Sequence, residues 1–179
     1  PCKGIKIVEA AHPVPDEAGT KATRRMLDLL EGLGEDDVVL ALISGGGSAL
    51  LNASAGGITL DEKRQLTDAL LSRGAPIGVI NGIRKQISAV KGGKLAAAAY
   101  PARMLALMIS DVPGDNPADI ASGPTVGDKG DAQRALDTLY RWKVTPPESV
   151  TAYLRKGGDP LAPDDERLSR VANVSYAAP

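Results

Sequence analysis

The chain has 179 residues and a formal net charge of −1, and 43% of its residues are hydrophobic. This length allows one domain with a sizeable core. The near-neutral charge creates no field that would attract nucleic acid, and an aromatic content of 3% leaves few side chains on which bases could stack. The one cysteine, Cys2, allows no internal disulfide and fits a reducing compartment, so we expect a cytoplasmic protein. Because no apolar stretch is long enough to cross a bilayer, we expect no membrane partner.

Strand-like and helix-like segments alternate along the chain. The expected elements are a strand at 5–8, a helix at 16–33, a strand at 38–43, helices at 59–73 and 76–91, a strand at 104–109, and helices at 131–142 and 147–156. The run at 38–43 is continuously apolar, which is typical of a parallel strand buried on both faces. Thr59 and Glu62 match a capping box. Alternation of this kind predicts an α/β fold, with a parallel sheet and helices on its faces.

The strand predicted at 38–43 ends in the run Ser44, Gly45, Gly46, Gly47 and Ser48. Three glycines in succession let backbone amides point toward one place, and the start of a helix adds partial positive charge there. The spacing matches neither a Walker loop nor a Rossmann fingerprint. Close packing of a strand against a helix is an alternative explanation. A second polar loop at another strand end favours a binding crevice for an anion.

That second loop begins after the strand predicted at 104–109 and contains Asp111 and Asp115. Ligands of open α/β sheets bind at the carboxyl ends of strands, so these acids would meet a metal ion or a substrate hydroxyl group. The loop continues to Thr125 through many small and turn-forming residues. No Cys/His cluster has zinc spacing, and the metal site we consider is a hard cation held by Asp115 or Asp111 with phosphate oxygens. Acids that cap turns are the alternative.

The helix predicted at 76–91 carries a polar stripe beside its apolar one. At about 100° per residue this stripe contains Asn81, Arg84, Ser88 and Lys91, and it is extended by Lys85, Gly92, Gly93 and Lys94. The stripe contains no acid, and it combines bare backbone with ammonium groups, which suits phosphate oxygens. A solvated helix face is the alternative.

These segments stand in the order found in class II glycerate kinases, the two-domain glycerate 2-kinases. The matching motifs are Ser44–Leu51, Asn81–Lys85 with Lys91–Ala96, and Ser110–Asp115 with Ala121–Thr125. The resemblance runs from about Val8 to Asp128. It implies a Rossmann-like three-layer α/β sandwich with a mostly parallel sheet, here incomplete. The implied reaction transfers the γ-phosphoryl group of ATP to the 2-hydroxyl group of D-glycerate with Mg²⁺ and gives 2-phosphoglycerate. The implied partners are therefore glycerate and a nucleotide.

The resemblance also implies residue roles. Asp111 would be the catalytic carboxylate that orients or deprotonates the attacking hydroxyl group. Arg84 and Lys91, together with Lys85, would hold the glycerate carboxylate or stabilise the transferring phosphoryl group. The loop at 44–48 would bind an anionic group through its amides. The other residues carried over are Asn81, Ser122, Gly123 and Thr125 for substrate or phosphate, and Asp115 for the metal.

The chain departs from the family pattern in two ways. Gln86 stands where family members commonly have histidine after the Arg-Lys pair. The family's early Gly-Ala-Gly-Lys phosphate loop and its C-terminal MOFRL domain have no counterpart in the sequence. We therefore expect residues 1–179 to be a partial N-terminal, MOFRL-associated domain that is inactive by itself. Its exposed sheet edges would favour self-association into a homodimer.

Two other functions stay open. Some family members carry the name hydroxypyruvate reductase, which would require a nicotinamide cofactor, but no glycine fingerprint with a ribose-binding acid occurs here. The other alternative is a non-catalytic module that binds sugar phosphates. Asp111 and Asp115 favour catalysis, because carboxylates repel a phosphate unless a cation intervenes.

Overall fold

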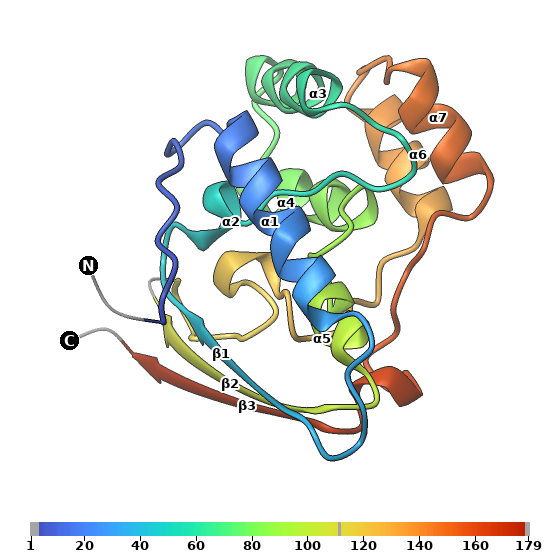
Figure 1. Cartoon of the computed structure of the whole chain (residues 1–179). Coiled ribbons are helices and arrows are strands. Elements are labelled where there is room, and N and C mark those ends of the chain that lie inside the picture. The colour runs from blue at the N-terminus through green and yellow to red at the C-terminus, as the bar shows by residue number, and fades with distance from the viewer. Residues whose placement is uncertain (1–3, 111, 178–179) are drawn as a thin grey trace.

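The computed structural model describes residues 4–110 and 112–177. It contains a parallel sheet of three strands in the order β1 (Val38–Ile43), β2 (Arg103–Ser110) and β3 (Val171–Ala177). In register, Val38 pairs with Arg103, and Met104 pairs with Val171. The strands lie side by side at the lower left of Figure 1. The predicted α/β class with a parallel sheet is confirmed.

The helices cover one face of this sheet (Figure 1). In chain order they are α1 (Glu17–Leu30), α2 (Gly47–Leu50), α3 (Leu60–Ser72), α4 (Ile77–Gln86), α5 (Lys94–Ala99), α6 (Ala132–Arg141) and α7 (Glu148–Arg155), with the 3₁₀ turns η1 (Ile120–Ser122) and η2 (Glu166–Leu168). Among the helices of residues 4–110 and 112–177, none is long and apolar enough to cross a membrane.

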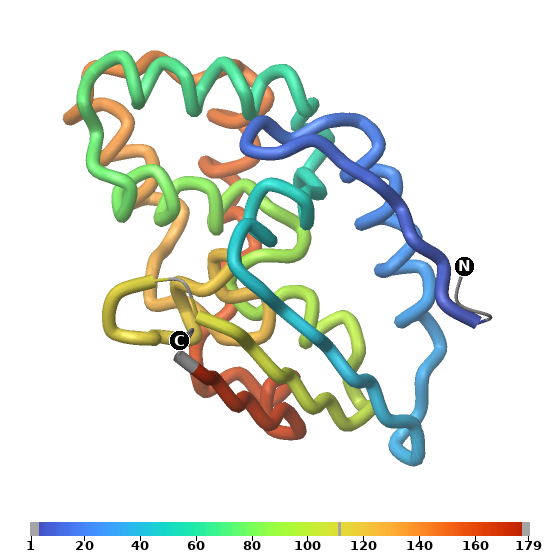
Figure 2. The backbone as a smooth tube through the Cα atoms, turned by 90° about the vertical axis from the view of Figure 1, so that its left-hand side faces the viewer, coloured from blue at the N-terminus to red at the C-terminus, as the bar shows by residue number. Residues whose placement is uncertain are grey.

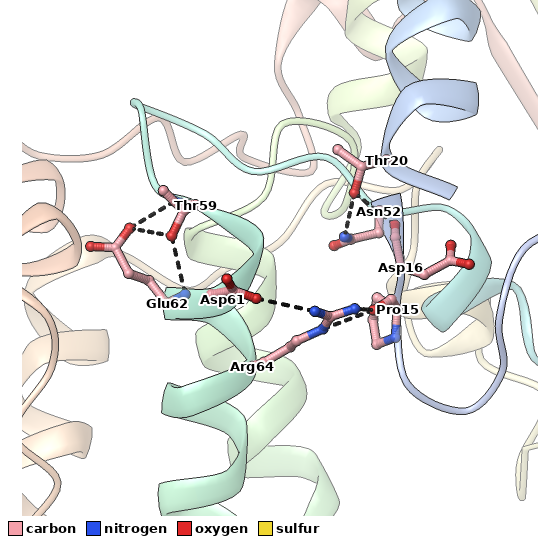
Figure 3. Close-up of polar contacts among 8 residues, drawn as sticks. All are labelled: Pro15, Asp16, Thr20, Asn52, Thr59, Asp61, Glu62 and Arg64. Atoms are coloured by element: carbon pink, nitrogen blue, oxygen red, sulfur yellow. Dashed lines mark hydrogen bonds and ion pairs between the residues drawn. The ribbon is translucent and has the colours of Figure 1, made fainter. Parts of the chain in front are cut away.

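Side chains at the N-termini of the helices explain where several of them begin. Asp16 caps α1 by accepting a hydrogen bond from the backbone N–H of Gly19 at 2.8 Å. The predicted capping box of α3 is confirmed: Thr59 Oγ1 accepts from the N–H of Glu62 at 3.2 Å, and Glu62 accepts from the N–H of Thr59 at 2.7 Å (Figure 3). Each cap satisfies a backbone donor that the helix itself leaves without a partner.

The core divides into a helical part and a sheet part. Leucine, isoleucine and valine side chains from α3, α4, α6 and α7 form the larger cluster, which lies away from the sheet. On the sheet, Met104, Ala106 and Met108 are buried against Ala96, Ala99 and Ile120 in two smaller clusters. Burial alternates along β2. The sheet therefore has one face packed against helices and one open face.

The prediction that β1 is buried on both faces is wrong for this chain. Val38 is 67% exposed, Leu40 58% and Leu42 72%, whereas the residues between them face the helices. The described residues supply one helical layer, so the second layer of a three-layer sandwich is not formed by them.

Two other element predictions were also wrong. Residues 5–8 form no strand, and Ile5 and Ile7 are 67% and 74% exposed. The helix predicted at 76–91 ends at Gln86. The chain leaves the helix there because Ala89 donates from its N–H to the carbonyl oxygen of Ala53 at 3.0 Å, next to a bridge between Ser54 and Ser88.

The helix start expected at the loop 44–48 is the short α2, whereas α5 and β3 were not predicted. The β3 strand is interrupted by polar residues such as Asn173 and Ser175, so its apolar pattern is weak. A backbone view from the side shows β3 beside β2, with the helices above them (Figure 2).

Candidate active site

The loop before α5 is docked on the loop that follows β2. Gly92 donates from its N–H to the carbonyl oxygen of Ser122 at 3.2 Å, and Gly93 donates to Gly123 at 2.8 Å. Both glycines have positive φ angles, 61° and 84°, which few other residues adopt without strain. The structure therefore brings the Lys91–Lys94 motif against the motif that ends at Thr125.

The glycine-rich loop at the end of β1 meets the same place. The hydroxyl oxygens of Ser48 and Ser122 lie 2.8 Å apart. A β-carbon on Gly47 would stand 3.1 Å from the methyl group of Ala121, so glycine allows this approach without displacing Ala121. Three motifs that are far apart in the sequence thus converge at the carboxyl ends of β1 and β2.

The residues at 121–123 adopt an unusual backbone conformation. Ala121, Ser122 and Gly123 have φ angles of 50°, 64° and 61°. A left-handed conformation costs a non-glycine residue about 1–2 kcal/mol. It persists where the surrounding contacts hold it, and such strain is frequent at binding sites. Here it directs the Ser122 hydroxyl toward Ser48 and the Ala121 carbonyl oxygen toward Lys91.

Lys91 joins these loops from the inside. Its side chain is 2% exposed, and Nζ lies 2.8 Å from the carbonyl oxygen of Ser48 and 3.2 Å from the Ser48 hydroxyl. The carbonyl oxygens of Leu51 and Ala121 follow at 3.3 and 3.5 Å. An ammonium group has three hydrogens, so these four oxygens occupy its donor capacity.

Lys63 on α3 is a site residue that the sequence analysis missed. It is 7% exposed, and Nζ donates to Oδ1 of Asn52 at 2.5 Å. Asn52 is fixed in turn, because its backbone N–H donates to Thr23 Oγ1 at 3.0 Å and its side-chain amide donates to Thr20 Oγ1 at 3.2 Å. Figure 3 shows the Asn52–Thr20 contact beside α3. The signal was present in the sequence: Lys63 stands three residues from both Leu60 and Leu66, in the buried stripe of the helix.

Arg84 on α4 faces the same space. Its side chain is half-buried, and no hydrogen bond or ion pair to it occurs within residues 4–110 and 112–177. A guanidinium group presents up to five N–H donors in a planar fork, which matches a carboxylate or phosphate group. The nearby acid that affects it is Asp68 of α3, which is exposed.

These cationic side chains line a cleft of about 270 Å³. Its polar lining comes from Ser48, Asn52, Lys63, Arg64, Thr67, Asp68, Arg84 and Lys91. One wall is the loop of Pro13, Val14 and Pro15, which Arg64 ties to α3. Arg64 Nε donates to the Pro15 carbonyl oxygen at 2.9 Å, and a second guanidinium nitrogen contacts Asp61 at 3.1 Å (Figure 3).

The electrostatics of the cleft favour an anion. Burial lowers the pKa of Lys91 to about 7, and the neighbouring charges of Lys63 and Arg84 add to this effect. Burial also lowers the pKa of Lys63 to about 8, with further contributions from Arg84 and Lys94. The pKa of Arg84 is lowered by burial too, and Asp68 partly opposes this change. A bound anion would offset the repulsion among these groups.

The other two lysines of the predicted stripe point elsewhere and do not line the cleft. Lys85 Nζ lies 3.5 Å from Asp128 and 4.0 Å from Asp119. Lys94 Nζ donates to the carbonyl oxygens of Lys85 and Ser88 at 3.1 and 2.7 Å, which satisfies acceptors at the end of α4. Asn81, also on α4, is half-buried and is not part of the cleft lining.

The other described residues predicted for the site do not line the cleft. Thr125 Oγ1 donates to Asn173 Oδ1 of β3 at 2.6 Å, so it fastens the loop to the sheet. Ser44 is exposed, and Gly45 and Gly46 are half-buried in the turn before α2. Asp115 is exposed, with a φ angle of 49°, and Asp111 lies outside the described residues.

The residues that the structure describes contain no group of three His, Cys, Asp or Glu side chains that could hold a metal ion without other ligands. Gln86 donates from Nε2 to Asp128 Oδ2 at 3.3 Å. Its Oε1 is buried and has no partner in the described part of the chain.

Comparison with known proteins gives consistent matches. A D-glycerate 2-kinase from Thermotoga maritima is 47% identical over 84% of this chain and 36% of its own length. A protein provisionally named hydroxypyruvate reductase from Agrobacterium vitis is 50% identical over 89% of this chain and 36% of its own length. The crystal structure of a T. maritima glycerate kinase has a TM-score of 0.90 and 42% identity, covering 98% of this chain and 41% of that one.

The chain thus spans less than half the length of these relatives. Residues 1–155 match the family model described as a domain of unknown function, DUF4147. The predicted resemblance to class II glycerate kinases is confirmed, and the chain belongs to the DUF4147 family.

Proposed function

We propose that this chain is the N-terminal part of a glycerate 2-kinase that phosphorylates the 2-hydroxyl group of D-glycerate with ATP. The observation that carries the proposal is the cleft in which Lys63, Arg84 and Lys91 gather. Both reactants are anions, and a phosphoryl-transfer site needs cations and N–H donors around them. The similarity to T. maritima proteins named as glycerate kinases supports the same reaction.

The reaction needs little covalent chemistry from the protein. The 2-hydroxyl oxygen forms a bond to the γ-phosphorus atom, while the bond from that phosphorus atom to the bridging oxygen of ADP breaks. The hydroxyl proton goes to a carboxylate, and Asp111 is the residue to which we assign this role. The remaining contribution is positioning and charge stabilisation, which the cleft cations and the N–H groups of the loop at 44–48 would supply.

The proposal includes Mg²⁺ as the counter-ion of ATP, with Asp115 as the candidate ligand in this chain. Asp115 is exposed, which leaves its carboxylate accessible to an ion that arrives with the nucleotide. A cytoplasmic location and a homodimer are further predictions, which follow from the single cysteine and the open sheet.

The test is phosphoryl transfer by the whole protein with D-glycerate, ATP and Mg²⁺. We expect formation of ADP together with 2-phosphoglycerate, which ³¹P NMR distinguishes from the 3-phosphate isomer. Asp111→Asn should abolish turnover and leave anion binding intact. Loss of both turnover and binding would make Asp111 structural, and ATP-independent consumption of substrate would contradict a kinase.

The name of the A. vitis relative suggests a reductase as the alternative. A nicotinamide cofactor is usually held by a glycine fingerprint that opens a helix after a strand. Here the turn after β1 reads Ser-Gly-Gly-Gly-Ser, and the helix that follows has 4 residues. We therefore expect no oxidation of NADH or NADPH in the presence of hydroxypyruvate, which absorbance at the nicotinamide band would measure.

A further inference from the structure

We infer that Lys63 and Arg84 together bind the carboxylate group of the acceptor, a small 2-hydroxy acid, and that Lys91 is a positioning residue. This inference rests on the proposed function and adds to it a residue, Lys63, and a division of roles. We call Lys63 and Arg84 together the carboxylate clamp.

The cationic side chains of the cleft differ in how many N–H donors the protein leaves free. Lys91 Nζ has four protein oxygens within 3.5 Å, so its hydrogens are already engaged. Lys63 Nζ has one acceptor, Asn52 Oδ1, which leaves two hydrogens for a ligand. The Arg84 side chain has no protein acceptor in the described part of the chain, so all N–H donors of its guanidinium group are left for a ligand. Arg64 also lines the cleft, but Pro15 and Asp61 engage all three of its guanidinium nitrogens. The cationic donors most available to a ligand are therefore those of Lys63 and Arg84.

The free donors lie at the end of the cleft away from the sheet. Lys63 and Arg84 come from α3 and α4. Ser48 lies in α2, which follows the end of β1, and Lys91 lies in the loop before α5. Figures 1 and 2 both show α3 on the side of the molecule far from the sheet. A short acid that spans the cleft would direct its carboxylate toward α3 and α4. Its hydroxyl group would then face the strand ends, where phosphoryl transfer is proposed.

The volume of the cleft also favours a small ligand. The cleft volume of about 270 Å³ is below the roughly 300–1,000 Å³ that is usual for drug-sized ligands. This space suits an acid of a few atoms better than a nucleotide. Apolar side chains line the remainder, and of these Leu60 is buried whereas Val14 and Leu71 are exposed at the cleft entrance.

Steady-state kinetics of the whole protein test the clamp. Loss of a charge-assisted hydrogen bond should raise KM for D-glycerate by about 10- to 100-fold in Lys63→Met and in Arg84→Gln. KM for ATP should stay within about 2-fold of the wild-type value, because the clamp does not contact the nucleotide. Arg84→Gln keeps the measurement decisive if Lys63→Met fails to fold, since the Arg84 side chain makes no hydrogen bond or ion pair within residues 4–110 and 112–177. Lys21→Met, at an exposed position of α1, is the matched control.

An uncharged acceptor makes the test specific for the carboxylate. The wild-type protein should strongly prefer D-glycerate over its amide, and this preference should shrink in Lys63→Met and return in Lys63→Arg. An unchanged KM for D-glycerate with a lowered kcat would overturn the clamp, because it would place Lys63 or Arg84 on the transferring phosphoryl group instead. A raised KM for ATP alone would overturn it as well.

Calorimetric titration with D-glycerate in the absence of ATP separates this inference from the proposed function. If the wild-type protein has no kinase activity but binds D-glycerate, and this binding weakens in Lys63→Met, the result would support the clamp and refute the proposed kinase function. Kinase activity with equal D-glycerate affinity in wild type and both clamp variants would support the kinase and refute the clamp.

Discussion

Lys91 Nζ donates a hydrogen bond to the carbonyl oxygen of Ser48 at 2.8 Å, and the two residues are separated by 43 positions in the chain. Ser48 in turn lies 2.8 Å from the Ser122 hydroxyl. This arrangement holds three loops around one buried cation. Because that cation lies beside Lys63 and Arg84, the contacts that hold the loops together are opposed by repulsion among the three positive charges.

The first prediction concerns stability as a function of pH. Burial and two neighbouring cations lower the pKa of Lys91 to about 7 from an unfolded-state value near 10.5. Between these values the unfolded chain binds more protons than the folded chain, so stability rises with pH, by up to about 1.4 kcal/mol per pH unit. Below pH 7 the destabilisation of the folded state by the charged, buried Lys91 is fully present, and above about pH 10.5 it disappears.

The comparison with Lys91→Met isolates this effect. Urea unfolding at several pH values should show the free energy of unfolding of the wild type rising relative to the variant from about pH 7 upward. Parallel curves for the two proteins would show that Lys91 keeps its ordinary pKa.

The second prediction is that an anion takes up protons when it binds. Near pH 8, Lys91 and Lys63 are partly deprotonated, since their pKa values are lowered to about 7 and about 8. A bound carboxylate or phosphate favours their charged forms. Calorimetric titration with D-glycerate in buffers of different ionisation enthalpy should therefore give buffer-dependent heats. Lys63→Met should reduce the uptake, and heats that do not depend on the buffer would contradict the account.

The third prediction concerns the left-handed turn. A β-carbon on Gly123 would stand 2.7 Å from the carbonyl oxygen of Ala118, at a φ angle of 61°. Gly123→Ala should thus destabilise the protein by about 1–3 kcal/mol and lower kcat through displacement of Ser122.

Gly82→Ala is the matched control for that change. Gly82 lies within α4, and a β-carbon there would meet nothing within 4 Å. It should stabilise the protein by about 0.5–1 kcal/mol through helix propensity. Denaturant unfolding measures both changes, and equal effects from the two substitutions would show that the turn is not strained.

The fourth prediction uses charge next to the clamp. Asn52→Asp would place a carboxylate where Oδ1 now lies 2.5 Å from Lys63 Nζ. This carboxylate would raise the pKa of Lys63 and compete with the substrate, so KM for D-glycerate should rise about 10-fold or more. Asp68→Asn at the cleft rim should change KM in the opposite direction, because the Arg84 charge then acts without its opposing acid. A change of the same sign in both variants, read from initial rates, would contradict this electrostatic account.

The parts of the fold that could be predicted from the sequence were those set by local patterns. The strand at 38–43 and the capping box at Thr59 were correct, because an apolar run and a side-chain cap depend on neighbouring residues. The helix from Pro76 was predicted too long, because the bridge between Ser54 and Ser88 that draws the chain out of the helix is a long-range contact. Local helical periodicity contains no signal for such a bridge.

The candidate site shows the same division. Lys91, Ser48 and Ser122 were named from their motifs, and the structure places them in contact. Lys85 was grouped with Arg84 because they are neighbours in sequence, yet on a helix they point apart, and Lys85 lies beside Asp128. Lys63 was missed because a lysine on an amphipathic helix normally faces solvent.

A crystal structure of the whole protein with D-glycerate tests the central claim most directly. We expect carboxylate oxygens within hydrogen-bond distance of Lys63 Nζ and the Arg84 guanidinium group, with the 2-hydroxyl group toward Ser48. D-Glycerate bound elsewhere, or with its carboxylate at the glycine-rich loop and its hydroxyl group toward α3, would contradict it.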